Sequence, residues 1–340
     1  MAGGGRYDRN SEAQARDAMS QVDLVAGAAR RVAALAPEAV VLADYGCAQG
    51  RVSNALIQSA IGEVRAADRD LPIMVIHNDL LSNDWAGLFS RLAGPDAYTA
   101  TPGGPITPLA SATSFFEPVA PPGSVHLALS FAAVQWLSAP GPAQTGPALF
   151  FDQLGDEARA RMAAQAHDDW RRFLSLRADE LAPGAVVVLD MMGRHEDGPA
   201  TAHDLWAIVA DACEEAVGEG LVERARRDAF VMPLYERTLT EVRRPFDEDV
   251  GARLRLEHLA IADAPHPATE RYADDRDAAA LARQMTGFLR AFSEPTLRAA
   301  LSLDDPALDA LYRRVEERIR DDAERFSFVV HPITAVVARR

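Results

Sequence analysis

The sequence has few cysteines and no long apolar run. It contains only Cys47 and Cys213 among 340 residues, which excludes a disulfide framework and a cysteine-based zinc site. No apolar stretch approaches the roughly 18 residues of a membrane-spanning helix. The first twenty residues carry Arg6, Arg9 and Arg16 and lack the apolar core of a signal peptide. We therefore expect a cytoplasmic protein that has no membrane partner.

The chain also lacks a surplus of basic residues. Its formal net charge is −15 at pH 7. Nucleic acids and anionic membranes attract basic surfaces, so we expect neither of them as a partner. Hydrophobic residues make up 48% of the chain, which is ordinary for a globular protein with a buried core. The length suits one enlarged domain or a core with a cap.

Several signature motifs are absent. The sequence has no G-x-G-x-x-G of dinucleotide-binding proteins and no G-x-S-x-G of serine hydrolases. It has no H-E-x-x-H and no C-x-x-C, which are typical of metal sites. His77, His126, His195 and His203 are scattered along the chain, so we expect them to be structural or surface residues. We expect no metal.

Apolar runs alternate with helical patterns over the first 190 residues. The runs predict buried strands at 39–43, 73–76, 125–129 and 185–189, and the helical patterns predict helices at 12–35, 51–67, 84–93 and 155–181. The stretches expected to be loops are 94–123 and 139–148, with a short helical piece before residue 137. This alternation predicts an α/β protein with a mainly parallel sheet.

The pattern changes after about residue 200. It becomes mostly helical at 203–217, 238–247, 273–293 and 305–324, and an apolar, β-branched tail follows at 326–337. We therefore expect a core formed by residues 1–200, a mainly helical cap formed by 201–325, and a C-terminal strand in 326–340 that returns to the core sheet.

A glycine turn, D-Y-G-C-A-Q-G at 44–50, follows the first predicted strand. Gly46 and Gly50 permit close backbone approach at the carboxyl end of a strand, where open α/β sheets bind ligands. A pyrophosphate favours helix N–H groups without a nearby carboxylate, whereas S-adenosylmethionine carries a cationic sulfonium and ammonium. Asp44 therefore favours S-adenosylmethionine. The alternative is a plain strand-to-helix turn with a solvated aspartate.

A second acid follows the next predicted strand, in H-N-D-L at 77–80. Asp79 stands where a carboxylate can accept hydrogen bonds from both hydroxyls of a ribose. The alternative interpretation is a helix N-cap or a turn aspartate, both of which are common positions for aspartate. In register with the glycine turn, Asp79 favours a cofactor that contains a nucleoside.

Further blocks occur in a fixed order. They are Y-D-R-N-S-E-A-Q (7–14), the glycine turn, N-D-L with N-D-W and Phe89 (78–89), S-F-F (114–116), S-F-A-A-V-Q-W-L-S (130–138), the helix and turn 173–184, Gly193-Arg194, and, in the expected cap, L-W (205–206), E-G-L (219–221) and P-L-Y (233–235). In these blocks the chain resembles the SABATH methyltransferases, whose known members methylate salicylate, benzoate, jasmonate, indole-acetate and related acids, and in a few cases xanthine nitrogens.

The resemblance implies a Rossmann-like class I methyltransferase sheet with a mainly helical cap. It implies S-adenosylmethionine as the cofactor, and a homodimer is possible because members of the family are often dimers. The cofactor-binding residues that it implies are Ser11, Asp44, Gly46, Gly50, Asp79, Leu80, Ser114 and Phe115.

The resemblance also implies how the substrate is held. Gln14 and Trp136 would orient the substrate carboxylate, because an amide and an indole are neutral N–H donors. A carboxylic acid is ionised at neutral pH, so no general base is needed. The expected reaction is an in-line methyl transfer that forms the methyl ester of a small, largely apolar acid, either aromatic, indolic or isoprenoid. The implied substrate pocket contains Tyr7, Ala132, Gln135, Leu205, Trp206 and Tyr235.

Two departures from the family pattern leave the substrate open. Ala132 stands in place of a tyrosine, which predicts a wider pocket. Gln135 stands in place of a histidine, as in the members that methylate purines, and adds an amide for a polar substrate atom. Methylation of a nitrogen heterocycle is therefore the alternative activity. A nicotinamide-dependent oxidoreductase and a cofactor-binding protein without catalysis are the competing functions, and Trp206 and Tyr235 are alternatively plain packing residues.

Overall fold

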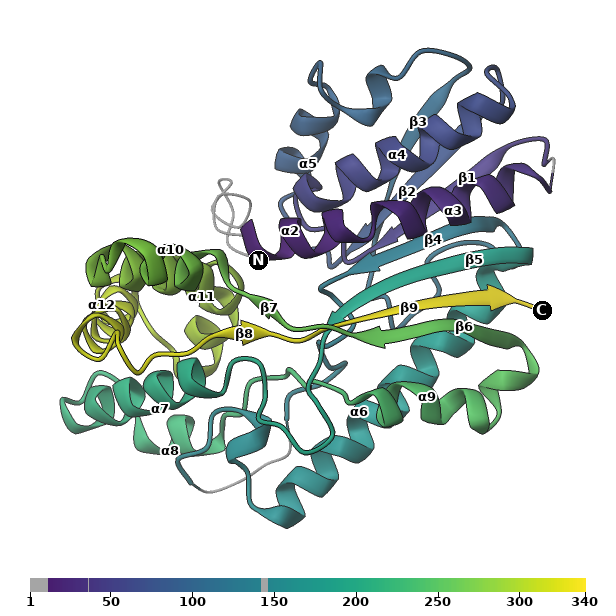
Figure 1. Ribbon diagram of the computed structural model, residues 1–340. Helices are drawn as coiled ribbons and strands as arrows, with labels where there is room; N and C mark the ends of the chain where they lie inside the picture. Colours follow the sequence, from purple (N-terminus) through teal and green to yellow (C-terminus); the bar gives the residue numbers. More distant parts are fainter. Residues whose placement is uncertain (1–11, 36, 142–145) are drawn as a thin grey trace.

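The five predicted strands and two further strands form one sheet. The structure is a computed structural model, which describes residues 12–35, 37–141 and 146–340. Within these ranges a seven-stranded sheet has the order β3-β2-β1-β4-β5-β9-β6 (Figure 1). Its strands are β1 (Val40–Tyr45), β2 (Ile73–Asp79), β3 (Ile106–Ala112), β4 (Val125–Phe131), β5 (Leu181–Met192), β6 (Leu254–Ile261) and β9 (Pro332–Arg339).

The strands β1 to β5 run parallel to their neighbours, and β9 runs antiparallel to both β5 and β6. Every residue of β1 is buried, and β4 and β5 are buried over most of their length. Continuous apolar strands of this kind suit a parallel sheet that is covered on both faces. The predicted Rossmann-like α/β fold is confirmed, and β9, near the C-terminal end of the described residues, is a strand of the same sheet.

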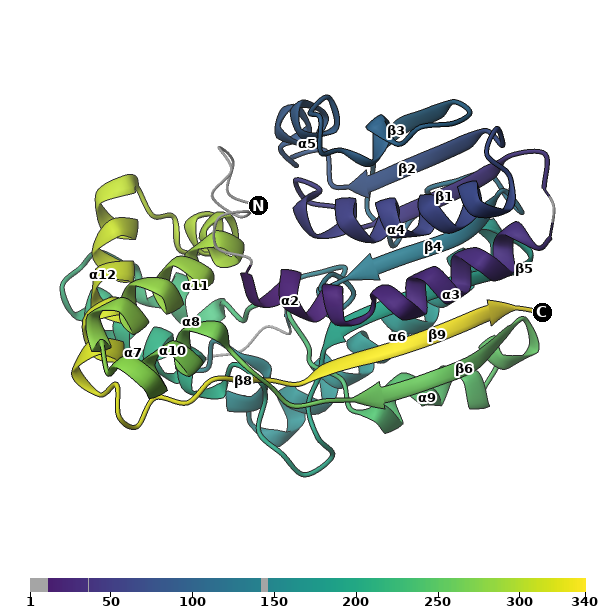
Figure 2. The ribbon, with the colours of Figure 1, turned by 45° about the horizontal axis from the view of Figure 1, so that its top comes forward.

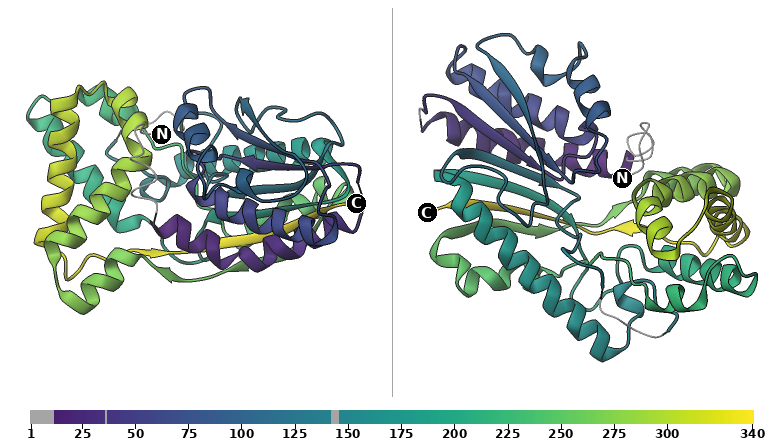
Figure 3. Two further views of the ribbon diagram at one scale, coloured as in Figure 1. Left: turned by 90° about the horizontal axis from the view of Figure 1, so that it is seen from above. Right: turned by 180° about the vertical axis from the view of Figure 1, so that it is seen from behind.

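Helices cover both faces of the sheet (Figure 3). The helices of one face pack on strand residues such as Leu42 and Val186, and those of the other face pack on residues such as Ala43 and Val187. On the first face lie α2 (Glu12–Ser20), α3 (Val22–Ala33), α4 (Arg51–Ala67) and α5 (Trp85–Leu92), and on the second lie α6 (Asp156–Glu180) and α9 (Leu239–Asp247). Short 3₁₀ helices are η1 (Tyr98–Ala100), η2 (Phe151–Gln153) and η3 (Val250–Ala252).

A helical lobe lies beyond the carboxyl ends of the parallel strands (Figure 2). Its core contains Trp206 and Tyr312. The Trp206 ring stacks on the ring of Phe150, with the ring centroids 5.0 Å apart. The lobe consists of α7 (His203–Gly218), α8 (Arg224–Ala229), α10 (Pro267–Asp275), α11 (Ala278–Leu301) and α12 (Asp305–Asp321). None of the helices in the described ranges combines the length and the apolar composition of a membrane span.

Three segments connect the sheet to this lobe: residues 193–202 after β5, residues 262–263 after β6, and His331 before β9. The last two continue from a two-stranded ribbon, β7 (Ala264–Pro265) with β8 (Val329–Val330). The imidazoles of His195 and His331 lie 2.7 and 2.9 Å from the same atom, Asp263 Oδ1. His195 therefore lies beside His331 in space, although the two are far apart in the sequence.

The structure corrects several predicted elements. The stretch 94–123 is not only loop, because it contains the edge strand β3. The helix predicted at 12–35 is interrupted at Gln21, and the segment before residue 137 is a turn and not a helix. The stretch 201–325 contains β6 and α9, which belong to the sheet and its covering layer. The boundaries of a separate cap stay a prediction.

Candidate active site

The glycine turn packs tightly between the ends of β2 and β4. Gly46 and Gly50 have φ angles of +80° and +77°, which favour glycine. The amides of Gly46 and Cys47 donate to the carbonyl oxygen of Asn78 at 2.9 and 3.0 Å. A Cβ atom on Gly46 would lie 2.4 Å from Ala133 Cβ. Because that contact leaves no room for a side chain, the turn requires glycine at position 46.

Asp79 joins the ends of β1 and β2. Its Oδ2 accepts a hydrogen bond from Ala48 N at 2.8 Å, and its Oδ1 accepts one from Leu80 N at 2.8 Å. Burial raises the pKa of Asp79. The helix that follows, α5, is capped by Asp84, which accepts from Gly87 N at 2.9 Å. The N-cap interpretation of Asp79 is therefore wrong.

Asp44 ends β1 in the interior. It is 3% exposed, so the alternative of a solvated aspartate is wrong. Its Oδ2 lies 3.3 Å from His77 Nδ1, and His77 Nε2 lies 2.7 Å from the hydroxyl of Tyr98. Asp44 and Gln14 line the same small hollow beside the glycine turn. Gln14 belongs to α2, so the structure brings this helix close to Asp44.

A cavity, here called the strand-end cavity, opens where the strands β1 to β4 end. Its lining includes Gly46, Asp79, Leu80, Ser114, Phe115 and Trp136. Five of the predicted cofactor residues therefore meet in one place. Carboxyl ends of parallel strands lie at one edge of a sheet, which is why residues far apart in the sequence converge here.

Phe115 is held in this cavity from behind by α6. Arg177 Nη1 donates to the carbonyl oxygen of Phe115 at 2.9 Å, and Arg177 Nη2 donates to Glu180 Oε1 at 2.8 Å. The hydroxyl of Tyr45 donates to Glu180 Oε2 at 2.6 Å. Both Arg177 and Glu180 lie in the block 173–184 that resembles the family, but nothing in the sequence indicated that they support residues of the cavity.

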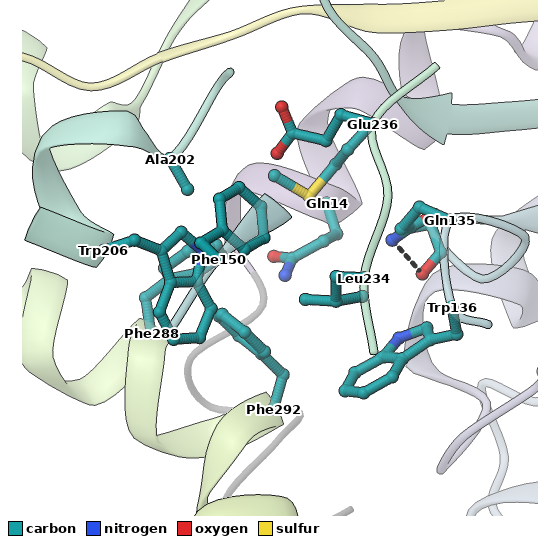
Figure 4. Close-up of a pocket in the computed structure, with 12 residues that line it drawn as sticks. Gln14, Gln135, Trp136, Phe150, Ala202, Trp206, Leu234, Glu236, Phe288 and Phe292 are labelled. Atoms are coloured by element: carbon teal, nitrogen blue, oxygen red, sulfur yellow. Dashed lines mark hydrogen bonds between the residues drawn. The ribbon is translucent and has the colours of Figure 1, made fainter. Parts of the chain in front are cut away.

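A second cavity, the acceptor pocket, lies on the lobe side of the first. Its wall is mostly aromatic and apolar, and Phe150, Trp206, Phe288 and Phe292 supply the rings. The amide of Gln14 reaches into the space between Phe150, Leu234 and Phe292 (Figure 4). Side chains from the sheet and from the lobe therefore form one pocket.

The two cavities share part of their lining. Ala132, Trp136 and Phe292 contribute to both. Ala132 has a φ angle of +51°, which is uncommon for a residue other than glycine, and its amide donates to the carbonyl oxygen of Asp190 at 2.9 Å. The boundary between the cavities is thus a strained turn after β4 with the Trp136 indole beside it.

One acid in the acceptor pocket was missed by sequence reasoning. Glu236 is 2% exposed and accepts a hydrogen bond from Thr201 N at 2.6 Å. Burial is the main cause that raises the pKa of Glu236 to about 8. A single glutamate in a loop after Tyr235 has no periodicity and no motif, so no sequence signal pointed to it.

Some predicted residues lie outside the two cavity walls. Leu205 is fully buried in the lobe core. The hydroxyl of Tyr235 donates to Glu241 Oε1 at 2.6 Å, and its ring packs on Phe151. Gly50 precedes α4, and a Cβ there would lie 2.5 Å from Leu88 Cδ1. Tyr7 and Ser11 lie outside the described residues.

Comparison with known proteins shows what this chain is similar to. A solved structure of loganic acid methyltransferase with S-adenosylhomocysteine superposes with a TM-score of 0.84 at 20% identity and covers 100% of this chain and 98% of that one. Gibberellic acid methyltransferase 1 of Arabidopsis thaliana is 26% identical over 328 residues, which are 88% of this chain and 84% of the relative. The 3,7-dimethylxanthine N-methyltransferase TCS1 of Camellia sinensis var. assamica is 26% identical over 303 residues, which are 84% and 80% of the two chains.

These relatives are a gibberellic acid methyltransferase and a dimethylxanthine N-methyltransferase, and the loganic acid methyltransferase shares the fold. The model of S-adenosylmethionine-dependent carboxyl methyltransferases matches residues 1–339. The glycine turn, the two acids and the order of the strands agree with that match. The chain therefore belongs to the S-adenosylmethionine-dependent carboxyl methyltransferases, the SABATH family.

Proposed function

We propose that this methyltransferase forms the methyl ester of a small, largely apolar carboxylic acid, which is aromatic, indolic or isoprenoid. The family and the cofactor, S-adenosylmethionine, follow from the match over residues 1–339. The acceptor pocket supports the finer assignment, because its wall is mostly apolar and its neutral N–H donors come from Gln14, Gln135 and Trp136.

The strand-end cavity fits the cofactor by the chemistry of its residues. Asp79 offers a carboxylate for ribose hydroxyls, Phe115 offers an aromatic face for adenine, and Ser114 and Leu80 complete that wall. Asp44 places a buried negative charge beside the turn. A cationic sulfonium compound without phosphate suits this set. When bound, S-adenosylmethionine supplies an activated methyl group.

The observation that carries the proposal is the position of Trp136. Its side chain lines both cavities. The Gln14 side chain enters the acceptor pocket from α2. We propose that the Gln14 amide and the Trp136 indole orient the substrate carboxylate at the boundary of the cavities. Because both are neutral N–H donors, they do not compete for the methyl group.

The arrangement suits an in-line displacement. The cavities lie on either side of the boundary formed by Ala132 and Trp136, so donor and acceptor would meet there from opposite sides. Proximity and orientation supply most of the rate in such a bimolecular step. The rings of Phe150, Trp206 and Phe292 enclose the acceptor pocket and exclude water from the reacting charges.

A second activity has one observation in its favour. Gln135 Oε1 is buried and has no hydrogen-bond partner among the described residues. An acceptor of this kind suits the N–H of a nitrogen heterocycle, and the tea relative is an N-methyltransferase. Methylation of a heterocycle nitrogen is therefore the alternative. A homodimer and a cytoplasmic location stay predictions of the sequence.

The decisive experiment is methyl transfer from labelled S-adenosylmethionine to a panel of aromatic, indolic and isoprenoid acids, with xanthines and phenols alongside. We expect base-labile label on one class of acids, which identifies an ester. Label that appears only on xanthines, and is stable to base, would replace the ester assignment with N-methylation. Binding of the cofactor, measured by calorimetry, shows in either case that the protein is competent.

A further inference from the structure

Two side-chain amide oxygens of residues that line the acceptor pocket have no hydrogen-bond partner among the described residues. Gln135 Nε2 donates to the carbonyl oxygen of Ala132 at 2.8 Å, which fixes the amide and leaves Oε1 buried and without a partner. Gln14 Oε1 is also buried and has no hydrogen-bond partner among the residues that the structure describes. A buried acceptor that lacks a donor is costly, so these atoms point to a ligand that brings donors.

Glu236 adds a carboxyl group to the same pocket. One of its oxygens accepts from Thr201 N at 2.6 Å, which holds the side chain in place. No arginine or histidine occurs among the described residues that line the pocket, so the carboxyl has no counter-ion there. Desolvation raises the pKa of Glu236 to about 8. Hydrogen bonds from the backbone of Thr201 and Ala202 offset this shift only in part, so the carboxyl in this apolar wall would gain from a further donor that a ligand brings.

The surroundings of Gln14 are acidic as well. Asp17 and Asp190 line a hollow that adjoins the acceptor pocket and shares Gln14, Ala132 and Met192 with it. Burial raises the pKa of Asp190 to about 8 and that of Asp17 to about 6. This side of the pocket therefore offers carboxyl oxygens that accept a hydrogen bond from a donor on a ligand.

We propose that Glu236 and the side-chain oxygen of Gln135 form a donor-binding subsite, which selects acids that carry an amino, ring N–H or hydroxyl group in addition to the carboxylate. The inference rests on the proposed function for the nature of the methylated group. It adds a specificity residue, Glu236, and narrows the substrate class from apolar acids to acids with a donor. Sites that hydrogen-bond a substrate donor reject analogues without it far more strongly than apolar pockets reject a missing methylene.

The test compares matched acids that differ only in one group, a ring amino or hydroxyl group in one and a methyl group in the other. Wild-type protein should favour the donor-bearing acid by at least about tenfold in kcat/KM, as the loss of one hydrogen bond implies. Glu236→Leu should bring this preference close to unity by lowering kcat/KM for the donor-bearing acid. Glu236→Gln keeps an acceptor oxygen and should restore most of the preference.

The matched control is Glu248→Gln, a partly exposed acid at the end of α9. It should leave the preference unchanged. Equal kcat/KM for both acids of every pair in the wild type would overturn the inference, and this comparison does not depend on the folding of any variant. The inference would also be overturned if Glu236→Leu kept the wild-type preference for the donor-bearing acid while its cofactor affinity and melting temperature were unchanged.

Failure of the inference is distinguishable from failure of the proposed function. If no acid is methylated, ester formation is wrong, and binding of the same pairs is then measured by calorimetry in the presence of S-adenosylhomocysteine. Tighter binding of the donor-bearing member to wild type, but not to Glu236→Leu, would support the subsite. Equal binding of both members would reject it.

Discussion

Arg177 and Glu180 form an ion pair in the interior, with 2.8 Å between Nη2 and Oε1 and side-chain exposures of 0% and 3%. The guanidinium carbon of Arg177 lies 4.1 Å from the centroid of the Tyr45 ring. Through the carbonyl oxygen of Phe115 and the hydroxyl of Tyr45, this pair connects α6 to the strand-end cavity and to the strand before the glycine turn. Loss of the pair is therefore expected to affect folding and cofactor binding together.

The first prediction concerns that pair. Arg177→Met should lower the free energy of unfolding by about 3–5 kcal/mol, because it leaves a buried carboxylate without its cation. Urea denaturation measures the change. The control is Arg172→Met on the same helix, whose pair with Glu117 is exposed at 52% and 54%. The control should cost less than about 1 kcal/mol, and equal losses in the two variants would contradict the assignment.

The second prediction concerns the glycine turn. Gly46→Ala combines a φ of +80° with a Cβ only 2.4 Å from Ala133 Cβ. Gly220→Ala has a similar φ of +75°, with nothing within 4 Å of the new Cβ. Gly220→Ala should cost about 1–2 kcal/mol of unfolding free energy from the backbone alone. Gly46→Ala should lower the unfolding free energy by more than Gly220→Ala does, and it should weaken cofactor binding, as measured by calorimetry. Equal effects of the two substitutions would argue against close packing of the turn.

The third prediction tests the indole donor. Trp136→Phe keeps an aromatic wall and deletes one N–H group. If this group binds the substrate carboxylate, kcat/KM for the best acid should fall about 10- to 100-fold, as for a hydrogen bond to a charged group, while cofactor affinity stays the same. Trp85→Phe on α5 is the control, because Trp85 lines neither cavity. Unchanged kinetics in Trp136→Phe would remove Trp136 from the site.

The fourth prediction concerns pH. Burial raises the pKa values of Glu236 and Asp190 to about 8 from unfolded values of 4.5 and 3.8. These two groups bind protons more tightly in the folded protein than in the unfolded chain, so their contribution to the free energy of unfolding should fall as pH rises from about 4 toward 8. Arg194 partly opposes the shift of Glu236, and Asp152 adds to it.

Urea denaturation at a series of pH values provides the measurement. Glu236→Gln removes one titrating group, so its profile should be flatter than that of the wild type between pH 5 and 8, as the linkage relation requires. Parallel profiles would mean that Glu236 is ionised in the folded protein at neutral pH. Burial lowers the pKa of His266 to about 4, which makes stability rise with pH over part of this range, so the difference between the two profiles is the quantity that tests Glu236.

The sequence predicted the parts of the molecule that have a strong local pattern. The continuous apolar runs at β1, β2, β4 and β5 could be recognised because buried parallel strands carry no polar alternation. The acids Asp44 and Asp79 could be placed together because the ends of parallel strands share one edge. The edge strand β3 could not be recognised, since Pro108 and its polar neighbours look like a loop.

The site was predictable only where a residue belongs to a motif. Gln14 and Trp136 were found through the family resemblance, and the structure places both in one pocket. Glu236 was not found, because its importance comes from burial beside Thr201, a residue of a distant segment. Leu205 matched the family but lies in the lobe core. Local patterns specify elements, whereas the direction of each side chain depends on packing between them.

The position of β9 has a consequence for synthesis of the protein on the ribosome. This strand is the last along the chain, yet it lies between β5 and β6, and β6 has no other neighbour in the described sheet. Until residues 332–339 emerge, β5 and β6 both present unpaired backbone edges. Non-local pairings of this kind form late and slowly, and open edges pair readily with other chains. A chain released before β9 is translated would therefore keep a divided sheet and would be a target for aggregation and proteolysis.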